Sequence, residues 1–145
     1  MANALYGYGR QAFGDGDIDW LNDTIKVTLI DTADYALGGN IDTHRYMNTN
    51  TVPAAAKVAT ATLGSKSNTL GVMNAGNVTF SAVSGDQSEA LIIWKDGGGG
   101  GTTESGTDDL LIAYIDTASS GLPVTPNGGD INVNWDTGAN KIFKL

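Results

Sequence analysis

After residue 23, apolar and polar side chains alternate with a period of two. The segment Thr24–Asp31 (TIKVTLID) places Ile25, Val27 and Leu29 on one side of an extended chain, which predicts a strand. Similar patterns predict strands over Lys57–Leu63, Asn68–Met73, Val78–Val83, Glu89–Lys95, Leu110–Asp116, Asp130–Trp135 and Lys141–Leu145. Because Gly, Asn and Asp turns separate about eight short strands, we predict an all-β, single-domain antiparallel β-sandwich or jelly-roll-like barrel.

Two of these segments are apolar throughout, and the chain between them is rich in glycine. Leu91–Trp94 and Leu110–Ile115 are predicted to be central strands with both faces buried. The connection Asp96–Asp109 (DGGGGGTTESGTDD) has five consecutive glycines, which are costly to order, so we expect a flexible acidic loop that tolerates shortening. Residues 32–56 are expected to form a long packed excursion that carries Tyr35, Leu37, Ile41, Tyr46 and Met47.

Residues 1–23 lack the strand pattern. A short helix is an option there, but Gly7 and Gly9 would each cost it about 1 kcal/mol. We therefore predict an irregular N-terminal arm over residues 1–23, followed by a β-sandwich domain over residues 24–145. Large apolar side chains gain little from exposure on a monomer, so the arm is expected to contact a sister subunit or another protein. The interface candidates are Leu5, Tyr6, Tyr8, Phe13 and Trp20.

Composition narrows the function classes. The chain has 145 residues, which suits one domain, and no cysteine, which excludes disulfides and thiol chemistry. Its net charge of −8 and its scattered Lys and Arg residues argue against a nucleic-acid partner. No apolar run approaches the ~20 residues of a membrane span, and the N-terminus lacks a secretory pattern. We expect a protein that stays in an aqueous cytoplasm until it assembles.

The sharpest candidate for metal chemistry is the acidic segment Asp15–Asp19 (DGDID). Alternating carboxylates are typical of the start of a calcium loop. An EF-hand would need Gly at position six and Glu at position twelve, where this chain has Trp20 and Lys26. A polar turn is therefore favoured, and a looser calcium site at Asp15, Asp17 and Asp19 stays open as an alternative.

The other candidates favour structural roles. His44 is the single histidine, and no G-x-S-x-G nucleophile elbow accompanies it. The adjacent Asp108 and Asp109 would face opposite ways on a strand, unlike a glycosidase pair. The tryptophans Trp20, Trp94 and Trp135 are expected in the core or at a subunit contact rather than on a sugar-stacking platform. We predict no catalytic residue, no cofactor and no metal.

Several segments near the two ends of the chain can be compared with known families. They are Ala4–Tyr6, Gly9–Phe13, Ile18–Val27, Leu111–Thr117, Gly121–Asp130, Trp135 and Gly138–Phe143. These segments together resemble small virion structural proteins of tailed bacteriophages. The resemblance implies a capsid decoration (cement) protein, made in the host cytoplasm and located on the capsid surface of the virion. It implies the major capsid protein as partner and self-association, which we expect to give a homotrimer.

A second function class stays open at this point. A small β module of a virion could also sit in the tail and bind a receptor or a glycan. The two alternatives differ in where aromatic side chains should lie. A tail module would expose aromatics beside carboxylates on a loop rim, whereas a cement protein would place them at subunit contacts.

Overall fold

The computed structural model describes residues 3–145, which form ten strands and one α-helix. The elements are β1 (Ala4–Leu5), α1 (Gly7–Asp15), β2 (Ile25–Ile30), β3 (Lys57–Thr62), β4 (Ser67–Thr69), β5 (Val72–Asn74), β6 (Val78–Phe80), β7 (Ala90–Lys95), β8 (Leu110–Ile115), β9 (Ile131–Val133) and β10 (Phe143–Lys144), with 3₁₀ turns at Asn40–Asp42 and Ala54–Ala56. The paired strands are antiparallel, so the predicted all-β, single-domain fold is confirmed.

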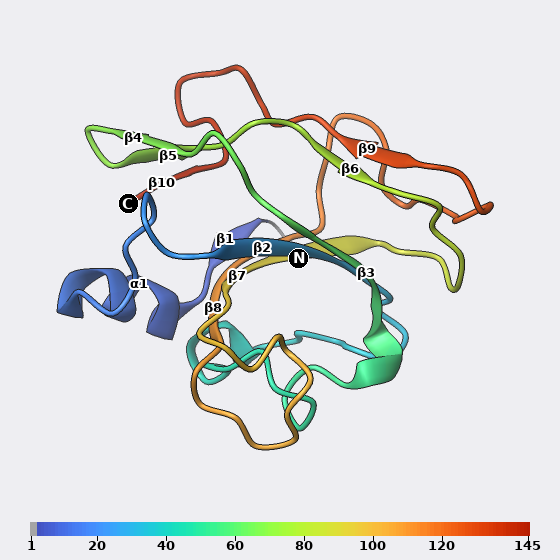
Figure 1. Ribbon diagram of the computed structural model, residues 1–145, viewed down its shortest axis with the longest axis horizontal. Coiled ribbons are helices and arrows are strands. Elements are labelled where there is room, and N and C mark those ends of the chain that lie inside the picture. Colours follow the sequence, from blue (N-terminus) through green and yellow to red (C-terminus); the bar gives the residue numbers. More distant parts are fainter. Residues whose placement is uncertain (1–2) are drawn as a thin grey trace.

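A five-stranded sheet in the order β1-β8-β7-β2-β3 forms the centre of the molecule (Figure 1). The two apolar segments are β7 and β8, and each has a strand on both sides, as predicted. The edges of the sheet are β1 and β3, and they do not pair with each other. The architecture is therefore a sandwich-like stack of layers rather than a closed barrel.

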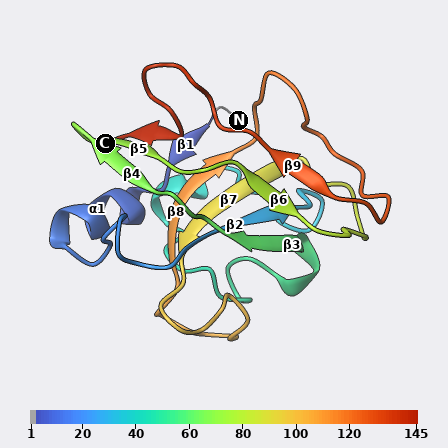
Figure 2. The same cartoon turned by 45° about the horizontal axis from the view of Figure 1, so that its top comes forward.

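Two smaller sheets cover one face of the central sheet, with orders β10-β5-β4 and β6-β9 (Figures 1 and 2). Val27, Leu29 and Ile93 point into this layer and pack in one cluster with Met73 and Phe80. Each of these side chains is buried, and full burial of a large apolar side chain stabilises a fold by roughly 1.5–3 kcal/mol. This layer is the main core of the domain.

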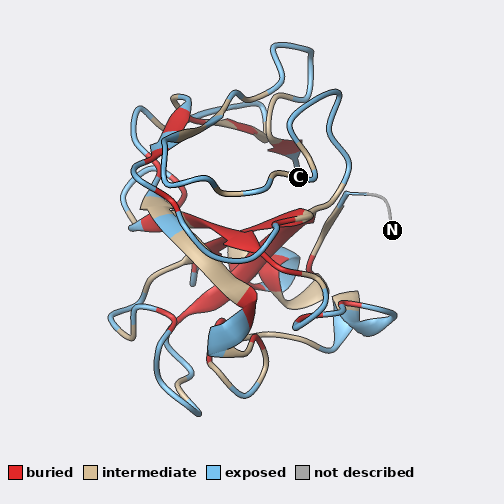
Figure 3. Ribbon diagram, turned by 90° about the vertical axis from the view of Figure 1, so that its right-hand side faces the viewer, coloured by how far each residue is buried: buried red, intermediate tan, exposed pale blue. Residues whose placement is uncertain are grey.

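Connections, not strands, cover the opposite face of the central sheet. Because side chains alternate along a strand, Ile92 and Trp94 point away from the main core and pack with Tyr35, Leu37 and Met47. The excursion after β2 is therefore a packed loop, as predicted. Figure 3 shows the buried residues concentrated between the layers and the exposed ones on the outer connections.

Residues 3–23 are an integral part of the domain and not an irregular arm, which corrects the prediction. β1 pairs with β8, with Ala4 opposite Tyr114, and the Asn3 side chain accepts hydrogen bonds from the N–H groups of Asp116 (3.0 Å) and Thr117 (2.9 Å). The Tyr6 N–H donates to the Ile112 carbonyl at 2.9 Å. Residues 1 and 2 lie outside the described part of the chain.

The glycines that argued against a helix are what let α1 pack. A Cβ at Gly9 would lie 2.6 Å from the Leu111 carbonyl oxygen, so only glycine allows α1 to approach β8 this closely. The helix ends at Asp15 and is capped by Gly16, whose φ of 83° is the left-handed conformation common at helix C-termini. Packing against β8 thus outweighs the low helix propensity of the segment.

The predicted strand Asn68–Met73 is a hairpin instead. β4 and β5 pair across a tight turn at Leu70 and Gly71, whose φ values are 52° and 81°. Positive φ at both central positions is the geometry of a two-residue hairpin turn. The sequence pattern did not indicate this turn, because Leu70 is an apolar residue of the kind expected in a strand.

The glycine-rich loop, residues 96–109, is held by two carboxylates at its base, contrary to the expected flexible tip. Asp109 accepts the first, third and fifth N–H of the glycine run, at 2.9, 3.3 and 2.6 Å, from Gly97, Gly99 and Gly101. Asp96 accepts the second and fourth, at 2.9 and 3.1 Å. Asp109 is buried, with only 2% of its surface exposed. Ordered contacts therefore offset the entropy cost that the sequence suggested.

Candidate interaction surfaces

Two of the predicted interface residues lie inside the domain. Tyr6 is 0% exposed and Trp20 is 2% exposed. Trp20 meets Phe143 edge to face, with ring centroids 5.3 Å apart, and its indole N–H donates to the Asn74 carbonyl at 3.1 Å. As core residues these two could reach a partner only if the domain opened, which corrects their proposed role. Leu5, Tyr8 and Phe13 are half-buried.

A cleft of about 390 Å³ with a mixed polar and apolar lining lies between the end of α1 and the sheet of β10, β5 and β4. We call it the Leu21 groove, and its apolar lining includes Phe13, Leu21, Met73 and Leu145. Leu21 is 52% and Leu145 is 49% exposed. Leu70, at 93%, sits on the adjoining hairpin, where the Gly71 carbonyl accepts the Leu145 N–H at 2.9 Å. The large apolar side chains that are exposed within residues 3–145 thus gather at one end of the molecule.

The acidic segment beside this groove is a polar turn, as favoured from the sequence. The Asp19 carboxylate accepts the Asn22 side-chain N–H at 2.7 Å and the Leu21 backbone N–H at 3.0 Å. The hydrogen bond from the Asn22 side chain first, and then those from the backbone N–H groups of Asn22 and Leu21, lower the pKa of Asp19. Asp15 instead accepts a hydrogen bond from Gln11 at 3.2 Å. The carboxylates of Asp15, Asp17 and Asp19 therefore do not converge as a calcium loop requires.

A second surface combines a cation with two aromatic rings, and we call it the Arg45 surface. The Arg45 guanidinium lies 5.2 Å from the centre of the Tyr8 ring and 5.2 Å from that of Tyr46. Tyr8 comes from α1, whereas Arg45 and Tyr46 run beside β8. The Arg45 carbonyl accepts the Leu111 N–H at 2.9 Å, and Tyr46 forms an isolated bridge with Leu110. The backbone of Arg45 and Tyr46 is thus held by β8, and Tyr8 is held by α1.

His44 ends a chain of hydrogen bonds that leads into the core. Its Nδ1 lies 2.9 Å from the Tyr35 hydroxyl, which lies 3.0 Å from the Tyr6 hydroxyl. Burial lowers the pKa of His44 and raises the pKa of Tyr35 to about 12. This environment keeps the imidazole and phenols neutral at pH 7, which suits a structural hydrogen bond.

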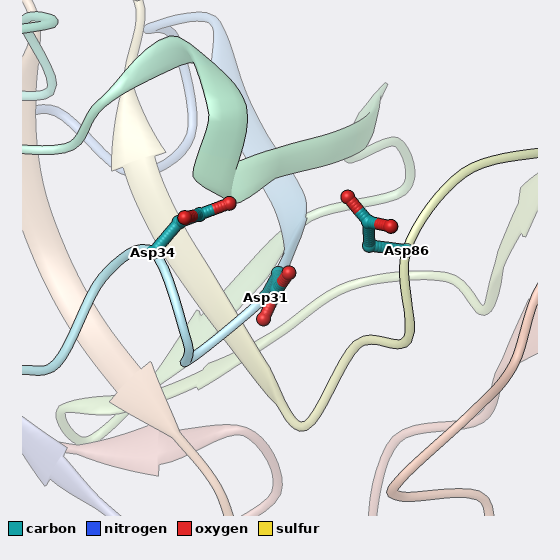
Figure 4. A group of neighbouring side chains, drawn as sticks. All are labelled: Asp31, Asp34 and Asp86. Atoms are coloured by element: carbon teal, nitrogen blue, oxygen red, sulfur yellow. The ribbon is translucent and has the colours of Figure 1, made fainter.

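Sequence reasoning missed one acidic cluster, at Asp31, Asp34 and Asp86 (Figure 4). One carboxylate oxygen from each residue lies within 4.8 Å of the others. Asp31 is buried at the end of β2 and also accepts the Ala33 N–H at 2.8 Å, while Asp34 and Asp86 are exposed. Oxygen ligands of this kind suit a hard cation. No local pattern could reveal the cluster, because Asp86 comes from a distant connection.

The tryptophans pack inside the molecule. Trp94 is 1% exposed, and its indole N–H donates to the Thr28 hydroxyl at 2.9 Å. Trp135 is half-buried against the main core and donates to the Gly76 carbonyl at 3.0 Å. Together with the burial of Trp20, this confirms the preference for packing over a sugar-stacking platform.

An open cleft of about 500 Å³ lies on another side, lined by Leu37, Glu89 and Tyr114 among others. The Glu89 carboxylate already accepts the backbone N–H of Thr32 at 2.9 Å and its hydroxyl at 3.2 Å. Burial raises the pKa of Tyr114. The Glu89 carboxylate of this cleft thus already has structural partners.

Comparison with known proteins adds no family. No protein-family model matches the chain, and neither does any curated protein. Within residues 3–145, no helix is long and apolar enough to cross a membrane. The case for function therefore rests on the surfaces described above.

Proposed function

We propose that the chain is a non-enzymatic virion structural protein that decorates and stabilises a tailed-phage capsid. The observation that carries the proposal is the Leu21 groove, where the large apolar side chains that are exposed within residues 3–145 gather. Contiguous exposed apolar surface usually marks a protein-binding site. The resemblance of both chain ends to small virion proteins supplies the kind of partner, the major capsid protein.

Two groups of the groove are held by contacts within the domain. Trp20, which lines the groove, packs edge to face on Phe143, and the Leu145 N–H donates to the Gly71 carbonyl. Side chains that are already ordered lose little entropy on binding. A modest contact of this kind suffices on a capsid, because the lattice repeats it at many equivalent sites.

The net charge of −8 fits the same role. A protein that is made free and assembles later must stay soluble in the meantime, and charge far from zero opposes self-aggregation. The tail-associated receptor- or glycan-binding module has less support. Its aromatic platform is missing among Trp20, Trp94 and Trp135, and Arg45 already lies over the rings of Tyr8 and Tyr46.

A particle-binding assay tests the proposal. Purified chain is added to phage particles that lack it, and bound protein is measured after sedimentation. The double variant Leu21→Ser, Leu145→Ser should bind at least about tenfold more weakly, because two apolar anchors worth ~1 kcal/mol or more each are lost. Leu122→Ser is the control, since this half-buried leucine lies in the connection between β8 and β9 and does not line the groove. The connection between β8 and β9 is drawn in orange in Figure 1. Equal binding by the double variant would contradict the proposed contact.

The proposed assembly also includes self-association as a homotrimer. Three copies around a local threefold axis would match the symmetry of a capsid lattice. Sedimentation equilibrium of the purified chain at increasing concentration tests this part. We expect a trimer mass, and a monomer over the whole range up to about 100 μM, well above typical affinities, would contradict it.

A further inference from the structure

The Arg45 surface holds an arginine without an acidic partner. Among residues 3–145, ion pairs join Arg10 to Asp42, Lys26 to Asp96 and Lys95 to Asp23, and none involves Arg45. The chain has sixteen acidic and eight basic residues, so carboxylates are abundant. An unpaired arginine in such a chain is therefore notable when it is also half-buried and fixed in place.

The two rings determine how Arg45 can bind. A guanidinium stacks its flat face on aromatic rings and keeps its N–H groups at the edge. The contacts to Tyr8 and Tyr46, at 5.2 Å each, thus hold the group without using its hydrogen bonds. The backbone of Arg45 and Tyr46 is held against β8 through Leu111 and Leu110. Such a group is preorganised for an external acceptor.

We propose that Arg45 binds a carboxylate in an acidic segment of the partner protein. A guanidinium edge matches a carboxylate with two parallel hydrogen bonds. A nucleic acid fits less well, because phosphate binding draws on several clustered cations and this chain carries a net charge of −8. The inference rests on the proposed function, since it names the chemistry of the capsid segment that would meet this surface.

Nuclear magnetic resonance of the arginine side chains tests the proposal directly. The chain has two arginines, Arg10 and Arg45, so their Nε–H signals are easily assigned by substitution. The probe is the capped peptide Gly-Asp-Phe-Glu-Gly, and its neutral counterpart is Gly-Asn-Phe-Gln-Gly. We expect the acidic peptide to shift the Arg45 signal and to leave Arg10, which is paired with Asp42, nearly unchanged.

Variants separate binding from folding. Arg45→Gln should weaken peptide binding about fivefold, the effect of losing one partly exposed ion pair. Arg10→Gln is the matched control and should bind as the parent chain does. Arg45→Lys keeps the charge but loses the paired geometry, so its affinity should fall between the two. Unchanged peptide binding by folded Arg45→Gln would overturn the proposal.

Two further results would also overturn it. They are equal Arg45 shifts with the acidic and the neutral peptide, and a tighter response to a thymidine hexanucleotide, which would indicate a phosphate site. The particle assay keeps this inference distinct from the proposed function. If the chain binds particles but the acidic peptide does not shift the Arg45 Nε–H signal, only the proposed carboxylate site is wrong. If the peptide binds through Arg45 but the chain does not bind particles, the carboxylate site is supported and the capsid proposal is wrong.

Discussion

Replacing Asp109 with Asn tests the hydrogen bonds that order the glycine-rich loop. The two side chains have nearly the same shape, so the change removes the charge and turns one oxygen into an NH₂ group. In the native chain, Oδ1 accepts the N–H groups of Gly97 and Gly99, and Oδ2 accepts that of Gly101. In the variant, the new NH₂ group would lie opposite at least one of these glycine N–H groups. Both groups are donors, so that hydrogen bond would be lost.

The expected cost follows from these contacts. A hydrogen bond to a charged group contributes about 1.5–3 kcal/mol, and a buried donor left unpaired costs about 1–3 kcal/mol. Lys57 adds to the effect, because burial lowers its pKa and the charge of Asp109 offsets that burial. Asp109→Asn should therefore reduce the free energy of unfolding by about 3 kcal/mol, a large part of the 5–15 kcal/mol typical of a domain.

Urea unfolding followed by tryptophan fluorescence measures this cost, since Gly101 packs against the Trp94 ring. Asp108→Asn is the matched control, because Asp108 is exposed, and its effect should stay within about 0.5 kcal/mol. An Asp109→Asn chain that unfolds within about 0.5 kcal/mol of the parent chain would refute the reasoning. The loop would then be the dispensable tip that its glycines suggest.

Three other substitutions test separate parts of the structure. Trp20→Ala should lower the free energy of unfolding in urea by about 3–5 kcal/mol, as the loss of a buried aromatic side chain does. A change near zero would contradict the burial of Trp20 in the core. Burial lowers the pKa of His44, so the folded state favours neutral imidazole, and stability falls as pH drops from the unfolded value of about 6.5. His44→Gln should flatten the dependence of melting temperature on pH between about 7 and 5, and an unchanged slope would contradict this. Asp86→Asn should stabilise the chain by about 0.5 kcal/mol at low salt and by nothing in about 1 M NaCl, because it relieves repulsion among three carboxylates; a loss of stability would contradict that reading.

Sequence reasoning succeeded where the pattern is local and long. The alternation in β2 and the uninterrupted apolar run of β7 identified central strands, because burial on a sheet imposes that periodicity directly. Tyr35, Leu37 and Met47 marked the long excursion as packed, since a loop with this many large apolar side chains must bury them. These features of the fold could be predicted without knowing what each residue touches.

It failed where the decisive partner is distant in sequence. Gly9 looks unfavourable for a helix until α1 is seen to approach the Leu111 carbonyl. The five glycines look flexible until Asp109 is placed beneath them. The Arg45 surface likewise needs Tyr8 from a different element. Such pairings follow from the tertiary structure, and single-chain patterns carry little signal for them.

The copy number of the chain in purified particles tests the central claim most directly. If the proposed capsid role holds, quantitative mass spectrometry of purified tailed-phage particles would detect the chain and compare its amount with that of the major capsid protein. A decoration protein should be present in a fixed ratio to that protein, at one copy or one trimer per equivalent lattice site. Absence from the particle, or the few copies typical of a tail component, would contradict the capsid account.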